Sequence, residues 1–235
     1  MKSSYVSITT LEGERFSAYL ARPDMPLGPT ILVLQEIFGV TSNIRAIAGD
    51  FAAAGYIAIA PDLFWRQQPN VDLDPASEEG RALATKLYKG LNEELALSDA
   101  LLALRYASSL PDADGRTAAV GYCLGGKIAY LLSTRGATEV AVSYYGVGIH
   151  AALGEMPHVS GKLLLQIAAN DHLCPPEAQA SLAVSAAKCA DRVQILTHVG
   201  VGHAFARRES SVFDAKASAD ADAATFQVMK EAFSL

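Results

Sequence analysis

The chain has 235 residues, of which 51% are hydrophobic and 19% charged, and its formal net charge at pH 7 is −6. This length and apolar content suffice for one large buried core, whereas the negative charge argues against binding to nucleic acid or to an anionic membrane. The N-terminus lacks the apolar segment of a secretory signal, and no apolar run reaches the ~18 residues of a membrane span. The three cysteines suggest no disulfide framework. We therefore expect a soluble, cytoplasmic protein that folds as a single domain over residues 1–235.

Short apolar runs alternate with longer amphipathic segments along the chain, after an opening hairpin predicted around residues 12–13. We predict the later strands at residues 30–34, 57–60, 117–120, 140–145, 163–168 and 193–197, with a turn at 111–115. We predict helices from residues 41–43 to 54 and at about 74–89, 91–110, 176–190 and 214–233, with a further helix beginning just after Cys123. This alternation predicts an α/β fold, with a mostly parallel central sheet of about eight strands and helices on both faces.

The segment RTAAVGYCLGGKIAYLL, residues 116–132, carries the clearest chemical signal. The run GYCLG at 121–125 has the spacing of the nucleophile elbow G-x-S-x-G, with Cys123 in place of the serine. Glycines two residues before and after the cysteine leave room for a sharp strand-to-helix turn that projects the sulfur from the sheet. The N-terminus of the following helix favours the thiolate form. The alternative is a small cysteine buried in a glycine-rich turn, without chemistry.

Polar side chains follow the other predicted strands at the end where function is expected. Glu36 comes after the strand at 30–34, Asp171 after 163–168, and His203 after 193–197. In open α/β sheets functional residues gather beyond the carboxyl ends of the strands. The order cysteine, aspartate, histidine is that of the α/β-hydrolase triad with its nucleophile changed. We therefore predict His203 as the base and Asp171 as the residue that orients it.

Glu36 is the unusual member of this group. Its carboxylate, at the end of a buried strand, would disfavour a nearby thiolate. It is either a proton acceptor that restrains Cys123 until substrate arrives or a charge at the N-terminus of the next helix. The backbone N–H groups of Ile37 and Leu124 are predicted to form the oxyanion hole, because this fold takes one donor after the nucleophile and one after the third strand.

The other histidines and cysteines have weaker contexts. His172 competes with His203 because it adjoins Asp171, although adjacent side chains rarely face the same way. Asp171 is alternatively a turn residue that binds nearby backbone N–H groups. Cys174 is close enough in sequence to line the site. We expect four histidines to be structural or solvated: His150, His158, His172 and His198. We expect Cys189 to be a buried helix residue.

Six segments along the chain match the pattern of a known family. They are QEIFG at 35–39, APDLFWR at 60–66, VGYCLGGKIAY at 120–130, YYGVG at 144–148, NDHLCP at 170–175 and GHAFARR at 202–208. Through them the sequence resembles the dienelactone hydrolase family, the carboxymethylenebutenolidases, over almost its whole length in one register.

The resemblance implies an α/β-hydrolase fold and the hydrolysis of dienelactone, an unsaturated cyclic lactone that bears a carboxylate, to maleylacetate. It implies that no metal or organic cofactor is needed and that the reaction serves the breakdown of chlorinated aromatics through chlorocatechols. In this pattern Cys123, His203 and Asp171 form the triad, and Glu36 takes the thiol proton once bound substrate displaces it from its resting partner.

The family's carboxylate-binding arginines fall on Arg81 and Arg207 of this sequence. A guanidinium binds a carboxylate through two parallel hydrogen bonds, which would hold the lactone carbonyl over the sulfur. The adjacent Arg208 is an alternative to Arg207. Arg81 is alternatively a charge on a helix surface, paired with Glu78 or Ser77.

The substrate itself is less well defined by the sequence. We expect Phe38, Tyr88 and Tyr145 to contact it. Thr85 stands where the resemblance leads us to expect a tyrosine, and Tyr88 where we expect a tryptophan, so the preferred lactone could differ. A related carboxylesterase or thioesterase is the alternative function, and a non-catalytic small-molecule binding protein is the third. We expect a monomer that acts on a small carboxylate-bearing molecule.

Overall fold

The computed structural model describes residues 1–24, 27–208 and 210–233. The chain forms two compact units, residues 1–118 and 119–235, and the division falls inside strand β5 (Ala113–Tyr122). The expectation of one domain over the whole chain stays a prediction. Among the described residues, no helix has both the length and the apolar character that crossing a membrane requires.

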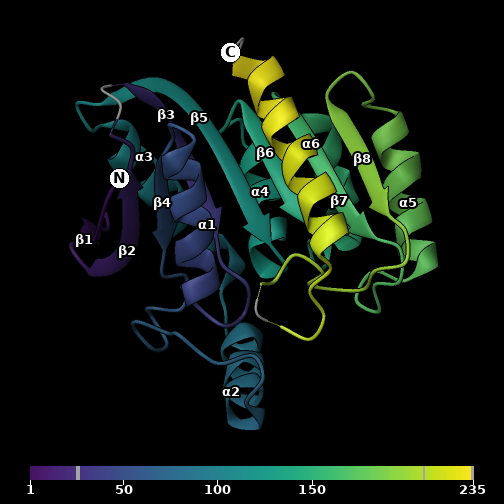
Figure 1. Cartoon of the computed structure of the whole chain (residues 1–235), viewed down its shortest axis with the longest axis horizontal. Coiled ribbons are helices and arrows are strands. Elements are labelled where there is room, and N and C mark those ends of the chain that lie inside the picture. The colour runs from purple at the N-terminus through teal and green to yellow at the C-terminus, as the bar shows by residue number, and fades with distance from the viewer. Residues whose placement is uncertain (25–26, 209, 234–235) are drawn as a thin grey trace. The chain divides into compact units, whose positions relative to one another are not determined.

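The first unit is a twisted sheet covered by helices (Figure 1). Its elements are β1 (Lys2–Thr9), β2 (Arg15–Arg22), β3 (Gly28–Leu34), α1 (Ser42–Ala53), β4 (Ile57–Pro61), α2 (Glu78–Lys89) and α3 (Glu93–Ser108). Its strands follow the order β1-β2-β4-β3-β5, with β1 and β2 as the predicted antiparallel hairpin and β3 parallel to β4. Every residue of β3 and β4 is buried, as their continuous apolar sequences predict.

The second unit continues the α/β alternation. Its elements after β5 are α4 (Leu124–Thr134), β6 (Val140–Tyr144), the 3₁₀ segment η1 (Ile149–His158), β7 (Lys162–Ala168), α5 (Pro176–Ala187), β8 (Val193–His198) and α6 (Ala215–Phe233). The strand order is β5-β6-β7-β8, and β6, β7 and β8 run parallel. Figure 1 shows α6 in front of β6 and β7, with α4 behind them. Both faces of this sheet are therefore covered, as predicted.

Two element boundaries differ from the prediction by more than three residues. Helix α2 begins at Glu78 rather than near 74, because Ser77 is its N-cap and its Oγ accepts a hydrogen bond from the Gly80 N–H at 3.1 Å. Asp74 instead accepts a bond from the Ala76 N–H at 2.8 Å, so it closes the turn before the helix. Strand β5 begins at Ala113, inside the segment predicted as a turn. The 3₁₀ segment η1 was not predicted.

A buried polar network joins α6 to the strands of the second unit. The side-chain amide of Gln166 donates to the Ala221 carbonyl at 2.7 Å and to Thr225 Oγ1 at 3.3 Å. The Thr225 hydroxyl also lies 2.7 Å from the hydroxyl of Tyr144. Because the Gln166 nitrogen is used toward α6, its carbonyl oxygen faces His198 Nε2 at 2.7 Å. His198 Nε2 must therefore carry a hydrogen and donate to Gln166.

The His198 imidazole is held in its neutral form by this environment. It is buried, and burial lowers its pKa below the usual value, although Asp220 opposes the shift and Lys216 adds to it. The unfolded chain consequently binds a proton at His198 more tightly than the folded protein does. Stability linked to this residue is present above the unfolded-state pKa, about 6.5, and is lost as the pH falls below it.

We expect the free energy of unfolding to fall between pH 7 and pH 5, and to fall less steeply in His198→Gln, which cannot titrate. Urea unfolding at several pH values measures both slopes. His150→Gln is the matched control, because His150 is exposed, and it should keep the slope of the parent protein. Equal slopes in the parent and in His198→Gln would contradict the assignment.

Candidate active site

Cys123 occupies a strained turn between β5 and α4. Its backbone angles are φ 55° and ψ −114°, a region that residues with a side chain rarely adopt. The Cys123 N–H donates to the Tyr144 carbonyl at 3.0 Å, and the Cys123 carbonyl accepts from Gly126 at 3.1 Å and from Val147 at 3.2 Å. These bonds hold the sharp strand-to-helix turn that the motif predicts. Cys123 is only 5% exposed.

The glycines around the cysteine are needed for close packing. A Cβ at Gly121 would lie 1.9 Å from the Gly125 carbonyl oxygen, so the first turn of α4 occupies the space of a side chain. A Cβ at Gly126 would lie 2.7 Å from Ser143 Oγ and 2.8 Å from the Cα of Gly146. Gly121 therefore makes room for the turn, as predicted. Gly126, which the prediction did not include, lets α4 approach the end of β6.

Leu124 is the first residue of α4. The N–H groups in the first turn of a helix have no acceptor within the helix, and they carry a partial positive charge. Cys123 precedes this helix and its side chain makes no capping hydrogen bond. A developing negative charge next to the sulfur would therefore find a donor in the Leu124 N–H, the role that the sequence predicts for it.

Asp171 and His203 are hydrogen-bonded to each other, as predicted. His203 Nδ1 lies 2.8 Å from Asp171 Oδ2, and the two side chains are 10% and 2% exposed. The other carboxylate oxygen accepts from the Leu173 N–H at 2.8 Å. Asp171 therefore serves both as a turn residue and as the partner of His203, although the sequence presented these roles as alternatives. His203 Nε2 is buried and has no hydrogen-bond partner among the described residues.

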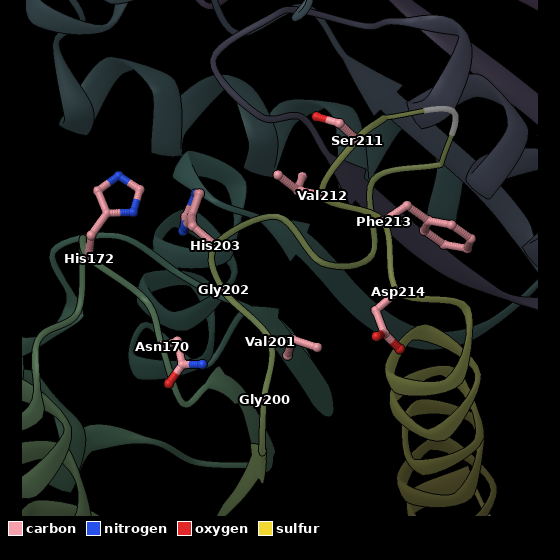
Figure 2. A pocket seen from close by; sticks show the side chains of 10 residues that line it. All are labelled: Asn170, His172, Gly200, Val201, Gly202, His203, Ser211, Val212, Phe213 and Asp214. Carbon is pink, nitrogen blue, oxygen red and sulfur yellow. The ribbon is translucent and has the colours of Figure 1, made fainter.

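An aromatic side chain packs against the His203 ring. Tyr145 lies edge-on to it with ring centroids 5.0 Å apart, and Phe205 lies 5.4 Å from Tyr145. Tyr145 has φ 41°, and its N–H donates to the Gln166 carbonyl at 2.8 Å. His172 is exposed, and the centroids of its ring and of the His203 ring are 6.1 Å apart. Figure 2 shows both side chains at the edge of a pocket that they help to line. The structure thus pairs His203, not His172, with Asp171.

The remaining second-unit candidates have distinct environments. Burial, together with the Asp171 carboxylate, raises the pKa of the Cys174 thiol to about 11, which keeps it protonated at neutral pH. Cys189 is buried, as expected, but it lies in the turn after α5 rather than in the helix. Arg207 is partly exposed, as is Arg208, and the Arg207 N–H donates to the Ala204 carbonyl at 2.9 Å. This bond fixes the backbone that follows His203.

The first unit holds Glu36, Ile37 and Phe38 directly after β3. Glu36 is 4% exposed and Phe38 is 6% exposed, while Ile37 is partly exposed in a turn. Helix α1 begins only at Ser42 and is capped by Thr41, and its first turn contains no acidic residue. The alternative that Glu36 is a charge at the helix N-terminus is therefore wrong, because the carboxylate lies in a buried segment before the helix.

Arg81 and Tyr88 both lie on α2. The Arg81 guanidinium donates to the backbone carbonyls of Pro75 at 3.1 Å and Ala76 at 2.6 Å, so it folds back onto the turn before its own helix. The guanidinium is therefore bonded to that turn rather than to the side chain of Glu78 or Ser77, the partners considered from sequence. Tyr88 is 39% exposed. Contact of either side chain with a substrate stays a prediction.

Gln166 was missed by the sequence interpretation. Its signal is a polar residue inside the apolar run of β7, LLLQIA at 163–168, where every residue is buried. Such a residue must find hydrogen-bond partners inside the protein, and here they come from β8 and α6. Among the described residues, no group of three or more histidine, cysteine, aspartate or glutamate side chains is arranged to hold a metal ion.

Comparison with known proteins identifies the family. The family model described as the dienelactone hydrolase family matches residues 16–233. The chain belongs to this family. It is 35% identical to carboxymethylenebutenolidase 1 of Cupriavidus pinatubonensis, over 97% of each chain. It is also 35% identical to the carboxymethylenebutenolidase of Pseudomonas putida, over 93% of this chain and 92% of that one. The protein is accordingly a hydrolase of ester or lactone bonds.

Solved structures agree on the fold. A dienelactone hydrolase-like promiscuous phosphotriesterase from metagenomic libraries superposes with a TM-score of 0.80 and 20% identity, covering 97% of this chain and 98% of that one. The predicted α/β-hydrolase fold is thereby confirmed. At this identity the likeness concerns the fold alone, and the roles of the individual site residues stay predictions.

The packing at the elbow predicts a large effect of a single methyl group. Gly121→Ala should lower the free energy of unfolding by about 3 kcal/mol or more, because its Cβ meets backbone that cannot rotate away. Chemical denaturation measures the loss. Gly154→Ala is the control, since no atom lies within 4 Å of its added Cβ, and it should change stability little. Similar stability in the two variants would contradict this packing argument.

Proposed function

We propose that this enzyme hydrolyses dienelactone, 4-carboxymethylenebut-2-en-4-olide, to maleylacetate in the breakdown of chloroaromatic compounds. The observation that carries the proposal is the partly buried His203, whose Nδ1 is hydrogen-bonded to Asp171 and whose buried Nε2 has no partner among the described residues. It lies in the unit that also holds the Cys123 elbow. The names of the two bacterial relatives support the choice of substrate. Within this proposal the enzyme is a cytoplasmic monomer that needs no cofactor.

Substrate binding is assigned to the two arginines predicted from the family pattern. Arg81 and Arg207 bind the substrate carboxylate, and a bidentate guanidinium–carboxylate pair fixes the orientation of the lactone ring. Phe38, Tyr88 and Tyr145 contact the rest of the molecule. This positioning holds the lactone carbonyl carbon near the sulfur. The attack on the carbonyl then needs no further bimolecular encounter, which lowers its entropic cost.

Activation of the thiol follows substrate binding. Glu36 restrains Cys123 at rest and accepts the thiol proton when the anionic substrate arrives. The thiolate then attacks the lactone carbonyl carbon and forms the S–C bond. The carbonyl electron pair moves to oxygen, and the oxyanion accepts hydrogen bonds from the N–H groups of Ile37 and Leu124. A donor at a helix N-terminus suits this role because it is already oriented toward the charge.

Collapse of the oxyanion breaks the ring C–O bond and leaves a thioester. The bond electrons go to the enol oxygen and form an enolate. The enolate takes up the proton that Glu36 received from the thiol, which gives the keto product and restores the Glu36 carboxylate. His203 next removes a proton from water, and the resulting hydroxide hydrolyses the thioester and returns the thiol. Asp171 stabilises the imidazolium that forms in this step.

This chemistry favours an activated ester over an amide. The enol leaving group of the lactone needs little protonation, so a thiolate nucleophile is sufficient. An amide nitrogen would require a stronger acid, which argues against peptidase activity. A carboxylesterase or thioesterase without the need for a carboxylate is the second candidate. The Arg81 hydrogen bonds to Pro75 and Ala76 favour it, because they occupy a guanidinium assigned to the substrate.

Cys123→Ala should reduce kcat/KM for dienelactone at least about 10³-fold, because no other group replaces the nucleophile. The loss of ultraviolet absorbance of cis- and trans-dienelactone measures the rate. Cys189→Ala, at a second buried cysteine, should retain most of the activity. Turnover by Cys123→Ala at the parent rate would exclude the proposed nucleophile, and no turnover by the parent would exclude the substrate.

Arg81→Ala should raise KM for dienelactone about tenfold, the size expected for one lost hydrogen bond to a charged group. It should leave the KM for a neutral ester, such as ethyl acetate, nearly unchanged. Arg105→Ala, at an exposed arginine of α3, is the matched control for the change in net charge. Equal effects on charged and neutral substrates would favour the carboxylesterase alternative.

A further inference from the structure

Gln35 follows β3 directly, and the proposed mechanism gives this residue no role. It is 0% exposed, and a buried amide must find hydrogen-bond partners inside the protein for both of its ends. Its Oε1 accepts a hydrogen bond from the Leu63 N–H at 3.1 Å, and its Nε2 donates to the Glu36 carbonyl at 3.2 Å. The side chain therefore forms a bridge between the segment after β4 and the peptide group that joins Glu36 to Ile37.

The Leu63 end of this bridge is a fixed point of the first unit. The N–H of the preceding residue, Asp62, donates to the Ser17 carbonyl of β2 at 3.0 Å. The Asp62 carboxylate, itself buried, accepts from the Phe64 N–H at 2.9 Å and from the Asn70 N–H at 2.6 Å. The backbone on both sides of Leu63 is thus held in place, so the bridge starts from a rigid position.

The Glu36 end of the bridge determines a direction. The carbonyl and the N–H of a trans peptide lie in one plane and point in opposite directions. The Glu36 carbonyl and the Ile37 N–H belong to one peptide group, so a bond that holds the carbonyl also fixes where the N–H points. Among the described residues, no backbone carbonyl accepts a bond from the Ile37 N–H. The donor predicted for the oxyanion hole is therefore not used by the backbone of its own turn.

The rest of this turn is held by the loop before α2. The Val40 N–H donates to the Val71 carbonyl at 3.0 Å, and the Leu73 N–H donates to the Phe38 carbonyl at 2.9 Å. These two bonds position the end of the turn. The bond from Gln35 acts on the preceding peptide group, which carries the predicted oxyanion donor.

We infer that Gln35 is a positioning residue, which orients the Ile37 N–H toward the oxyanion of the reaction. The inference rests on the proposed function, in which this N–H stabilises the oxyanion. Gln35 acts through the peptide group between Glu36 and Ile37 rather than by contact with the substrate. The direction matters because a hydrogen bond weakens steeply as its donor angle departs from linearity. A donor that is already oriented stabilises the developing charge without reorganisation during the reaction.

Gln35→Met should lower kcat for dienelactone about tenfold or more, because methionine has nearly the same length but cannot donate to the Glu36 carbonyl. KM should stay within about twofold of the parent value, since an oxyanion donor acts in the transition state rather than on the bound substrate. Gln35→Asn is the second variant, which keeps a buried amide but is one methylene too short for the bridge. It should show the same split between kcat and KM, also if Gln35→Met does not fold.

Gln67→Met is the matched control, because the Gln67 side chain also donates to a backbone carbonyl of the first unit, that of Leu87, at 2.9 Å. It should retain kcat within about twofold of the parent value. An equal loss of kcat in Gln67→Met and Gln35→Met would overturn the inference, because the effect would then follow from any lost amide bond of this unit.

A second measurement separates the oxyanion donor from the thiol. When 1,1,1-trifluoroacetone reacts with a thiolate, an S–C bond forms and the carbonyl electron pair becomes an oxyanion. Iodoacetamide also bonds to the sulfur, but iodide leaves and no oxyanion forms. Both Gln35 variants should raise the trifluoroacetone concentration that protects Cys123 from iodoacetamide about tenfold. The alkylation rate without the ketone, measured by mass spectrometry of the Cys123 peptide, should stay within about twofold of the parent rate.

Equal changes in ketone protection and in alkylation rate would overturn the inference. Gln35 would then act on the reactivity of the thiol, through the Glu36 carboxylate or through the fold, and not on the oxyanion donor.

Failure of this inference is distinguishable from failure of the proposed function. Dienelactone turnover that requires Cys123 but keeps the parent kcat in both Gln35 variants overturns the inference and leaves the function intact. Absence of dienelactone turnover in the parent, with the expected loss of ketone protection in the variants, overturns the lactone assignment and supports the positioning role. A parent protein whose Cys123 the ketone does not protect overturns the inference, whatever its turnover of dienelactone.

Discussion

The strained turn at Cys123 is the constraint on which the candidate site depends. A positive φ at a residue with a side chain is unfavourable by itself, so the surrounding backbone must hold it. The Tyr144 carbonyl at the end of β6 accepts a hydrogen bond from the Cys123 N–H. The Gly125 carbonyl occupies the space that a side chain at position 121 would need. The turn therefore exists only because β5, α4 and β6 are already in place.

The same dependence continues outward from the turn to His203. The Gln166 carbonyl fixes Tyr145 in a second strained conformation, and the Tyr145 ring then lies against His203. The side chain of Gln166 meanwhile ties β7 to His198 and to α6. A buried network of this kind is stabilising only when each member has its partners. The C-terminal helix thus contributes to the geometry of a site that it does not line.

Much of the candidate site was predictable because its signals are local. The G-x-C-x-G spacing indicates a sharp turn, because the backbone next to the cysteine leaves no room for side chains. The apolar runs indicate buried strands, whose carboxyl ends carry the functional residues in this kind of sheet. The start of α2 was not predictable from Asp74, since aspartate caps turns as readily as helices. The start of α1 was predictable, since Thr41 caps it within the predicted range of 41–43, and this start leaves Glu36 outside the helix.

By itself, the sequence determined the alternation of strands and helices, the cysteine at the elbow and the order of the acid and base that follow it. Only the tertiary structure decided that Asp171 binds His203, 32 residues away, rather than serving the turn alone. It also decided that Arg81 turns back to its own backbone and that the segment before α6 forms a pocket wall. The physical reason is that periodicity and steric demand are properties of neighbouring residues, whereas side-chain partnerships depend on distant segments that meet only after folding.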